Sequence, residues 1–411
     1  MIALYYILLL LMPFWNYPKL PKFGETWTLI KIAGVVTVLA AALQALMDGS
    51  RPRLLHWRES RLFLLLSGWA AVSAWTISRW EWAAFPLMSY LSLAAYLFPT
   101  LIFLQDVTAL RSACQWVAWS MLLASYSVFS QFVKYGVSRP GGIVGDPNYY
   151  ALVAVCMLPL CLALWPDSTG VRRVLIGLTC GLLIASTLLG ASRGGFLSLL
   201  FCLGYLIFHG RRRVLLLAGL VVLMAGMTWL LPHTPLDRFV QGDRGTAVST
   251  EIRRELLKAG WEMIKAQPLT GVGLGMFKPR TAELQTAVAD GRIGHNTYVE
   301  VAAELGLPAC LLFLAILWSG WRRSRKLAKW FSDRGQIVAS RIARAVEAGI
   351  IAYAVGALFL SAEYVRQLWL LVWFGLALAQ IAEAGEEEGE APGPERIEHE
   401  LALPEHAVAS E

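Results

Sequence analysis

The chain has 411 residues, of which 57% are hydrophobic and only 16% are charged. Because a typical soluble domain carries about 25% charged residues, this composition excludes an ordinary soluble globular protein. The apolar residues are grouped in runs of roughly 17–25, the length that an α-helix needs to cross a bilayer. The sequence therefore predicts an all-α, polytopic integral membrane protein.

The net charge of +7 is unevenly distributed along the chain. Residues 384–411 hold nine Glu and one Arg, so this tail carries −8 and the remainder carries +15. In a membrane protein, such an excess is typical of basic cytoplasmic loops and does not indicate nucleic-acid binding. The tail is poor in aromatic residues, and we expect it to be disordered.

Twelve apolar runs are candidate transmembrane helices, nine within residues 1–231 and three within 297–383. The first run lacks the basic segment and cleavage site of a signal peptide, so we interpret it as a span. Lys and Arg gather in alternate connections, which predicts that both termini are cytoplasmic and that the long loop 232–296 faces outward. The runs lie near residues 1–15, 27–47, 61–78, 82–104, 110–133, 149–165, 172–190, 194–209, 212–231, 297–320, 342–360 and 366–383.

The outer loop, residues 232–296, contains two predicted helices. The first extends from Thr250, a potential cap, to Gln267, and it carries an apolar stripe at helical spacing before Pro268 ends it. The second is predicted over Pro279–Ala289. Glycines at 271, 273 and 275 connect the two helices.

His295 stands at the junction between this loop and the tenth apolar run, followed at once by Asn296. An imidazole at a water–membrane boundary is suited to proton transfer near neutral pH. Glu300 and Glu304 are four residues apart and share a helix face, which we expect to point into the bundle because a charge facing lipid is costly. A simpler interpretation makes His295 an interfacial cap residue.

Arginines are candidates for binding an anionic ligand. Arg193 lies in the segment GASRGGFLSL, between two apolar runs with almost no polar loop between them. Its planar guanidinium suits bidentate contact with phosphate, although an arginine at a span end can also simply extend toward water. Arg253 and Arg254 add positive charge to the first loop helix, which alone is typical of a solvated face.

A second outer turn, GGIVGDPNYYA at residues 141–151, leads into the sixth run. Pro147 fixes the turn, and Asp146 and Asn148 can cap the following helix or orient neighbouring groups. Helix capping is favoured over direct catalysis.

The chain lacks the sequence motifs of serine hydrolases, zinc proteases, nucleotide-binding loops and dinucleotide-binding folds. All six cysteines fall in apolar runs without metal-ligand spacing. We therefore expect an enzyme that uses neither a metal nor a cofactor, with arginines offsetting the charge of its substrate.

Four segments in order make the chain resemble the O-antigen ligase family, whose relatives include O-antigen polymerases and protein O-oligosaccharyltransferases. The resemblance extends over nearly the whole chain, and its last two segments are the most specific. The segments are GDPNYYA at 145–151, SRGG at 192–195, IRRELLKAGWEMIKAQPLTGVGLGMF at 252–277 and HNTYVEVAAELG at 295–306.

The resemblance implies a glycosyltransferase in the bacterial inner membrane that takes a glycan from undecaprenyl diphosphate. In ligases the acceptor is a hydroxyl of the lipopolysaccharide core, reached at the periplasmic face without a metal. By this resemblance, Arg193 with Arg253 or Arg254 would hold the diphosphate, and Arg253 is favoured by its register to Lys258. His295 would be the general base of an inverting transfer.

Three alternatives stay open. An O-antigen or exopolysaccharide polymerase and a protein O-oligosaccharyltransferase would share the donor site, although the compact length and the single late outer loop favour a ligase. A transporter of lipid-linked glycans would have symmetric halves with charges near the midplane, and no such symmetry is visible. A structural assembly subunit would leave His295 and Arg193 dispensable.

Overall fold

The computed structural model describes residues 1–14, 22–23, 27–49, 54–209, 244–283 and 293–390. Within them the chain is helical apart from one short antiparallel pair, β1 (Lys22–Phe23) and β2 (Trp27–Thr28), and three single 3₁₀ turns, η1 (Met12–Phe14), η2 (Gly142–Val144) and η3 (Trp165–Asp167). The α-helices are α1 (Ile2–Leu11), α2 (Leu29–Met47), α3 (Arg58–Thr76), α4 (Trp80–Phe103), α5 (Val107–Tyr135), α6 (Pro147–Leu164), α7 (Gly170–Leu189), α8 (Arg193–His209), α11 (Arg244–Ala266), α12 (Phe277–Glu283), α13 (Thr297–Asp333), α14 (Ile337–Gly356) and α15 (Arg366–Glu390).

Six of the described helices are long and apolar enough to cross a membrane: α2, α4, α6, α7, α13 and α15. This confirms a helical, multi-pass membrane protein, while the count of twelve stays a prediction. The apolar helices α1 and α8 are shorter than a span. The helix α14 carries charged side chains such as Arg344 and Glu347. The predicted span near 212–231 lies outside the described residues.

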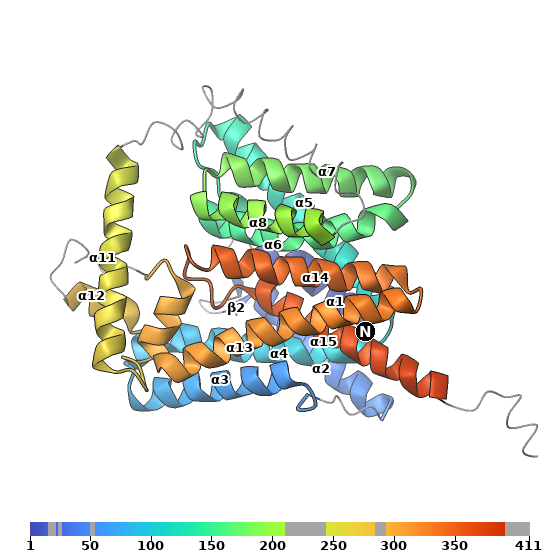
Figure 1. Ribbon diagram of the computed structural model, residues 1–411, viewed down its shortest axis with the longest axis horizontal. Coiled ribbons are helices and arrows are strands. Elements are labelled where there is room, and N and C mark those ends of the chain that lie inside the picture. The colour runs from blue at the N-terminus through green and yellow to red at the C-terminus, as the bar shows by residue number, and fades with distance from the viewer. Residues whose placement is uncertain (15–21, 24–26, 50–53, 210–243, 284–292, 391–411) are drawn as a thin grey trace, which may run out of the picture.

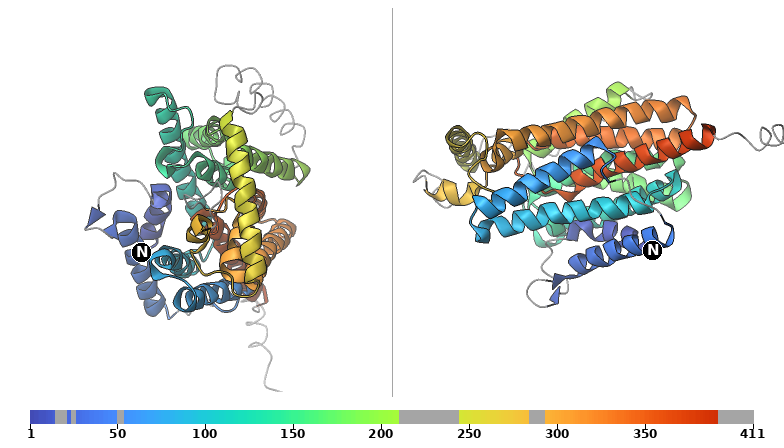
Figure 2. Two further views of the ribbon diagram at one scale, coloured as in Figure 1. Left: turned by 90° about the vertical axis from the view of Figure 1, so that its left-hand side faces the viewer. Right: turned by 90° about the horizontal axis from the view of Figure 1, so that it is seen from below.

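The long helices lie side by side along the long axis of the molecule, and α11 runs across one end of them (Figures 1 and 2). The helix α13 packs against α14, α3 and α11, and α14 packs against α6 and α8. Aromatic rings fill the space between α3 and α15, where the ring centre of Phe63 lies 4.4 Å from that of Trp369 and 5.1 Å from that of Trp373. The polar residues of the predicted site lie at this end of the bundle, beneath α11.

The helix α13 is broken near its beginning. Gly306 has φ 83° and ψ 168°, a conformation that is essentially restricted to glycine, and Pro308 two residues later has no N–H to donate. The break frees backbone carbonyls inside an apolar bundle. Because an unsatisfied backbone group there costs several kcal/mol, each needs a partner from elsewhere in the chain.

The glycine-rich segment after α11 supplies most of these partners. The N–H groups of Val272 and Gly273 donate to the carbonyls of residues 303 and 304, at 2.8 and 2.9 Å. The N–H of Leu307 donates to the Pro268 carbonyl at 2.8 Å, and the Trp69 indole donates to the carbonyl of residue 305 at 2.8 Å. The outer segment 268–273 is therefore built into the interrupted helix.

Replacing Gly306 by alanine should destabilise the protein strongly. A Cβ at this position would lie 2.2 Å from the Leu269 carbonyl oxygen, and the positive φ adds strain of about 1–3 kcal/mol. We expect a clearly lower midpoint of thermal unfolding in detergent. The matched control is Gly181→Ala in α7, where a Cβ meets nothing within 4 Å and the helix should gain slightly. Equal midpoints for the two variants would contradict this account of the break.

Three predicted boundaries differ from the structure. The helix α11 already includes Arg244, so Thr250 lies inside the helix and is not its cap. The helix α12 begins at Phe277, two residues before the predicted start, and residues 284–289 lie outside the described residues. The helix α15 continues to Glu390, so the first part of the tail predicted to be disordered is helical, while residues 391–411 are not described.

The extension of α15 has a physical reason. Glutamate is a good helix former, and the acidic turn contacts the end of α13. Glu386 accepts a hydrogen bond from the Trp330 indole at 2.8 Å and lies 3.8 Å from the Arg334 guanidinium.

Candidate functional site

The connection between α14 and α15, residues 357–365, holds the beginning of α13 in place. The N–H of Thr297 donates to the Ala357 carbonyl at 2.9 Å, and its hydroxyl donates to the Leu360 carbonyl at 2.6 Å. The same hydroxyl accepts from the Ala362 N–H at 2.9 Å. These bonds fix the first turn of α13, and with it the residues that precede the helix.

His295 lies directly before this turn, half-buried, with a left-handed φ of 51°. Its backbone N–H donates to the Ser361 hydroxyl at 3.0 Å. Asn296 caps α13 by accepting from the N–H groups of Tyr298 and Val299 at 3.0 and 3.1 Å. The backbone of the predicted catalytic histidine is therefore fixed on both sides.

Glu300 completes this arrangement from the first turn of α13. It is buried, accepts from the Gly294 N–H at 3.0 Å and receives a hydrogen bond from the Ser361 hydroxyl. The Ser361 hydroxyl also accepts from the His295 N–H. Glu300 and Ser361 therefore hold two successive backbone N–H groups, those of Gly294 and His295. Glu300 is thus positioned to orient His295 through its backbone.

Glu304, one turn further along α13, contacts the glycine-rich segment and the start of α12. Its two carboxylate oxygens accept from the N–H groups of Gly275 and Phe277, at 2.8 and 3.0 Å. The second of these groups opens α12. The buried carboxylate therefore secures the glycine-rich segment and the start of α12 to α13.

Two of the three predicted arginines, Arg193 and Arg253, come together with Arg139. Arg193 begins α8 and is exposed, Arg253 lies half-buried in α11, and Arg139 lies in the connection after α5. Burial lowers the pKa of Arg253, repulsion from Arg139 and then Arg193 lowers it further, and Asp146 acts in the opposite direction. Three separate segments thus bring positive charge to one place, and we call Arg139, Arg193 and Arg253 the arginine cluster.

The second outer turn supports this cluster. Asp146 caps α6, accepting from the N–H groups of Asn148 and Tyr149 at 2.8 and 2.9 Å. The Asn148 side chain accepts from Arg139 Nη2 at 3.3 Å, and Arg139 Nε donates to the Gly190 carbonyl at 3.4 Å. Asp146 therefore caps a helix as expected, and Asn148 orients an arginine.

The connection 357–365 adjoins both groups of residues. The Tyr149 hydroxyl donates to the Ser361 carbonyl, and a Cβ on Gly194 would lie 2.7 Å from the Phe359 Cβ, so the beginning of α8 packs directly on this connection. The beginning of α8, Tyr149 and His295 therefore all contact the same short connection, and α11 crosses this end of the bundle (Figure 1).

A comparison with protein-family models gives a match over residues 178–314 to the family described as O-antigen ligase. This stretch of the chain is thus similar to the O-antigen ligase family. The matched region contains Arg193, Arg253 and His295, which lie on α8, on α11 and directly before α13. A comparison with curated proteins gave no match.

Arg253 and Arg254, both within the matched region, are distinguished by their environment. Successive helical residues point about 100° apart, so only one of the two can face a given neighbour. Arg253 is half-buried and interacts with Arg139 and Arg193, whereas Arg254 is exposed. Arg253, the residue favoured from its register, is thus the one beside the other two arginines, and its contact with diphosphate stays a prediction.

Sequence reasoning missed three residues of this site: Arg139, Ser361 and Glu363. Arg139 and Ser361 each lie in a connection between two apolar runs, where a single arginine or serine gives no signal. Glu363 is buried, and within the described part of the chain its Oε2 atom has no hydrogen-bond partner. Burial and the neighbouring carboxyl of Glu300 raise the pKa of Glu363 well above its usual range. A single acid in the short connection between α14 and α15, without a surrounding motif, gives no signal in the sequence.

Within residues 1–14, 22–23, 27–49, 54–209, 244–283 and 293–390, no group of three or more His, Cys, Asp or Glu is placed to hold a metal ion. The six cysteines are free and buried. That the protein works without a metal stays a prediction, to be tested with a chelator.

Proposed function

We propose that this protein is an O-antigen ligase, which transfers a glycan from undecaprenyl diphosphate to a hydroxyl of the lipopolysaccharide core at the periplasmic face of the inner membrane. The observations that support the proposal are the arginine cluster and the ordered His295, whose neighbouring segments both contact the connection 357–365, together with the family match over residues 178–314. Cationic side chains beside an ordered histidine suit a reaction with an anionic leaving group and a hydroxyl acceptor.

The arginine cluster is proposed to bind the donor diphosphate. Guanidinium groups make bidentate, charge-assisted hydrogen bonds to phosphate oxygens, and their fixed charge stabilises the negative charge that builds on the leaving group. The repulsion that Arg139 and Arg193 exert on Arg253 makes an anion favourable there. A diphosphate leaves without being protonated, so no general acid is required.

His295 is proposed to be the general base. The imidazole takes the proton of the acceptor hydroxyl as the hydroxyl oxygen forms its bond to the anomeric carbon. The bond from that carbon to the diphosphate oxygen breaks in the same step, and the electron pair leaves with undecaprenyl diphosphate. Attack from the side opposite the leaving group inverts the anomeric centre. Asn296, Glu300 and Ser361 act as positioning residues, since they fix the backbone around His295.

The orientation of the protein is part of the proposal. Basic residues crowd the second half of α13 and the start of α14, which predicts that this end is cytoplasmic and that the end bearing His295 is periplasmic. Both termini would then lie in the cytoplasm. The polyprenyl chain of the donor would enter from the bilayer, and membrane lipids are expected partners.

A reconstituted transfer assay tests the proposal. Purified protein is mixed with an undecaprenyl-diphosphate-linked glycan and rough lipopolysaccharide in the presence of EDTA. We expect a ladder of glycan attached to lipopolysaccharide. Lengthening of the donor glycan alone would instead make the protein a polymerase, and transfer to an added protein acceptor would make it an oligosaccharyltransferase. Donor binding with neither product would favour a transporter of lipid-linked glycans.

A further inference from the structure

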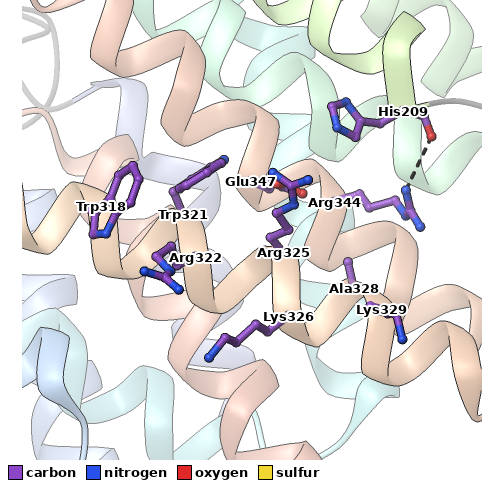
Figure 3. A pocket seen from close by; sticks show the side chains of 10 residues that line it. All are labelled: His209, Trp318, Trp321, Arg322, Arg325, Lys326, Ala328, Lys329, Arg344 and Glu347. Atoms are coloured by element: carbon purple, nitrogen blue, oxygen red, sulfur yellow. Dashed lines mark hydrogen bonds between the residues drawn. The ribbon is translucent and has the colours of Figure 1, made fainter.

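A cavity of about 700 Å³ lies far from the candidate active site, between the second half of α13, α14 and the end of α8 (Figure 3). Its wall is mainly basic and aromatic. The side chains drawn there include Trp321 and Arg325 from α13, Arg344 and Glu347 from α14 and His209 at the end of α8.

The cavity has an excess of positive charge, which the one carboxylate in its wall, Glu347, offsets only in part. Arg322, Arg325, Lys326 and Arg344 line it, and among the described residues no carboxylate oxygen lies within 4.0 Å of their charged nitrogens. Glu347 is the one carboxylate in the lining, and it is buried at 3% exposure. Unneutralised cations around a cavity favour an anionic ligand.

Two tryptophans indicate where this cavity lies relative to the membrane. The Arg322 guanidinium lies 5.8 Å from the Trp318 ring centre, and the Arg325 guanidinium lies 5.6 Å from the Trp321 ring centre. Trp318 is 55% exposed. Tryptophan together with arginine at the end of an apolar helix is typical of the boundary between hydrocarbon and headgroups.

The length of α13 supports the same location. The two parts of α13 between Thr297 and Trp318 together hold about 20 residues, roughly the number that a helix needs to cross a bilayer, although the break at Gly306 makes their combined rise shorter than that of a straight helix. The cavity therefore lies at the membrane surface opposite His295. An exposed apolar stripe connects the two ends, with Leu311 at 65% and Leu314 at 41% exposure leading to Trp318.

We propose that this cavity binds the phosphate-diester headgroup of an anionic phospholipid, whose acyl chains lie along the stripe formed by Leu311, Leu314 and Trp318. The cations supply the charge complement of the phosphate. The stripe, which leads directly to the cavity mouth, distinguishes a lipid from a free phosphate because only a lipid has hydrocarbon to place there. The proposal is independent of the glycan transfer.

The test measures lipid binding to the full chain purified in a neutral detergent. Phosphatidylglycerol and phosphatidylcholine with identical acyl chains are titrated, and bound lipid is counted by native mass spectrometry. We expect phosphatidylglycerol to bind more tightly, and Arg325→Ala/Arg344→Ala to weaken it by roughly tenfold or more. The matched control is Arg172→Ala/Arg173→Ala in the first turn of α7, which removes the same charge from exposed positions of the same predicted membrane surface.

Three outcomes would overturn the proposal. They are equal binding of the two lipids, equal loss in the cavity and control variants, and competition by inorganic phosphate or glycerol phosphate at the concentrations at which the lipid binds. The last result would identify a site for free phosphate. Thermal unfolding checks that the variants are folded. Should the first pair fail to fold, Arg322→Gln/Lys326→Gln, at exposed positions, repeats the measurement.

Discussion

Replacing His295 by asparagine is expected to reduce glycan transfer by about 10²–10⁴-fold, the usual contribution of a general base. Asparagine is a better choice than alanine because residue 295 has φ 51°, and asparagine tolerates this left-handed conformation more readily than most residues do. The variant should keep the hydrogen bond from its backbone N–H to Ser361. The loss should therefore fall on turnover and leave donor binding nearly unchanged.

Initial rates of transfer and donor affinity, measured in the reconstituted assay, separate these effects. His56→Ala is the matched control, since this exposed histidine contacts Glu383 near the end of α15 and has no part in the proposed chemistry. A His295→Asn variant with near-normal transfer would reject the histidine as the base. A variant that lost donor binding as well as turnover would show that His295 has a structural role.

Arg253→Ala should lower kcat/KM for the lipid-linked donor by roughly 10²-fold, whereas Arg254→Ala should change it little. The larger effect follows from removing one fixed donor to a developing negative charge. Arg253 is half-buried among Arg139, Arg193 and Asp146, while Arg254 is exposed on the same helix and its charge is screened by solvent.

The pair is a sensitive comparison because both variants lose one arginine from adjacent positions of α11. Arg139→Ala, at the residue that the sequence did not reveal, should behave like Arg253→Ala. Equal losses in the Arg253 and Arg254 variants would mean that the charge of α11 acts as a whole. A loss confined to the Arg254 variant would reject the assignment of the cluster.

The sequence predicted the parts of the molecule that depend on local pattern. Apolar runs predicted most of the long helices, and Asp146 before Pro147 predicted the cap of α6. His295 was recognisable because its neighbours Gly294 and Asn296 mark the start of a helix in the same short segment. The family match over 178–314 agrees with the resemblance drawn from those segments.

The rest depends on contacts between distant segments, which leave no local pattern. Ser361 reaches His295 across 66 residues, and Arg139 meets Arg253 only because α11 crosses the end of the bundle. Glu304 shares a predicted helix face with Glu300, but its bond to the glycine-rich segment cannot be read from that spacing. The break at Gly306 is a one-residue conformation that helical periodicity does not encode either.

The break at Gly306 also has a consequence for how the protein tolerates its bilayer. The turns of α13 before the break are bonded to residues 268–273 and 357–365, whereas the longer part that follows carries the lipid-facing leucines. A straight helix would transmit any tilt along its whole length. With a joint at Gly306, the long part can adjust its tilt to membranes of different thickness while the short part keeps its place. We therefore expect the geometry around His295 to be insensitive to acyl-chain length, because thickness is accommodated on the other side of the joint.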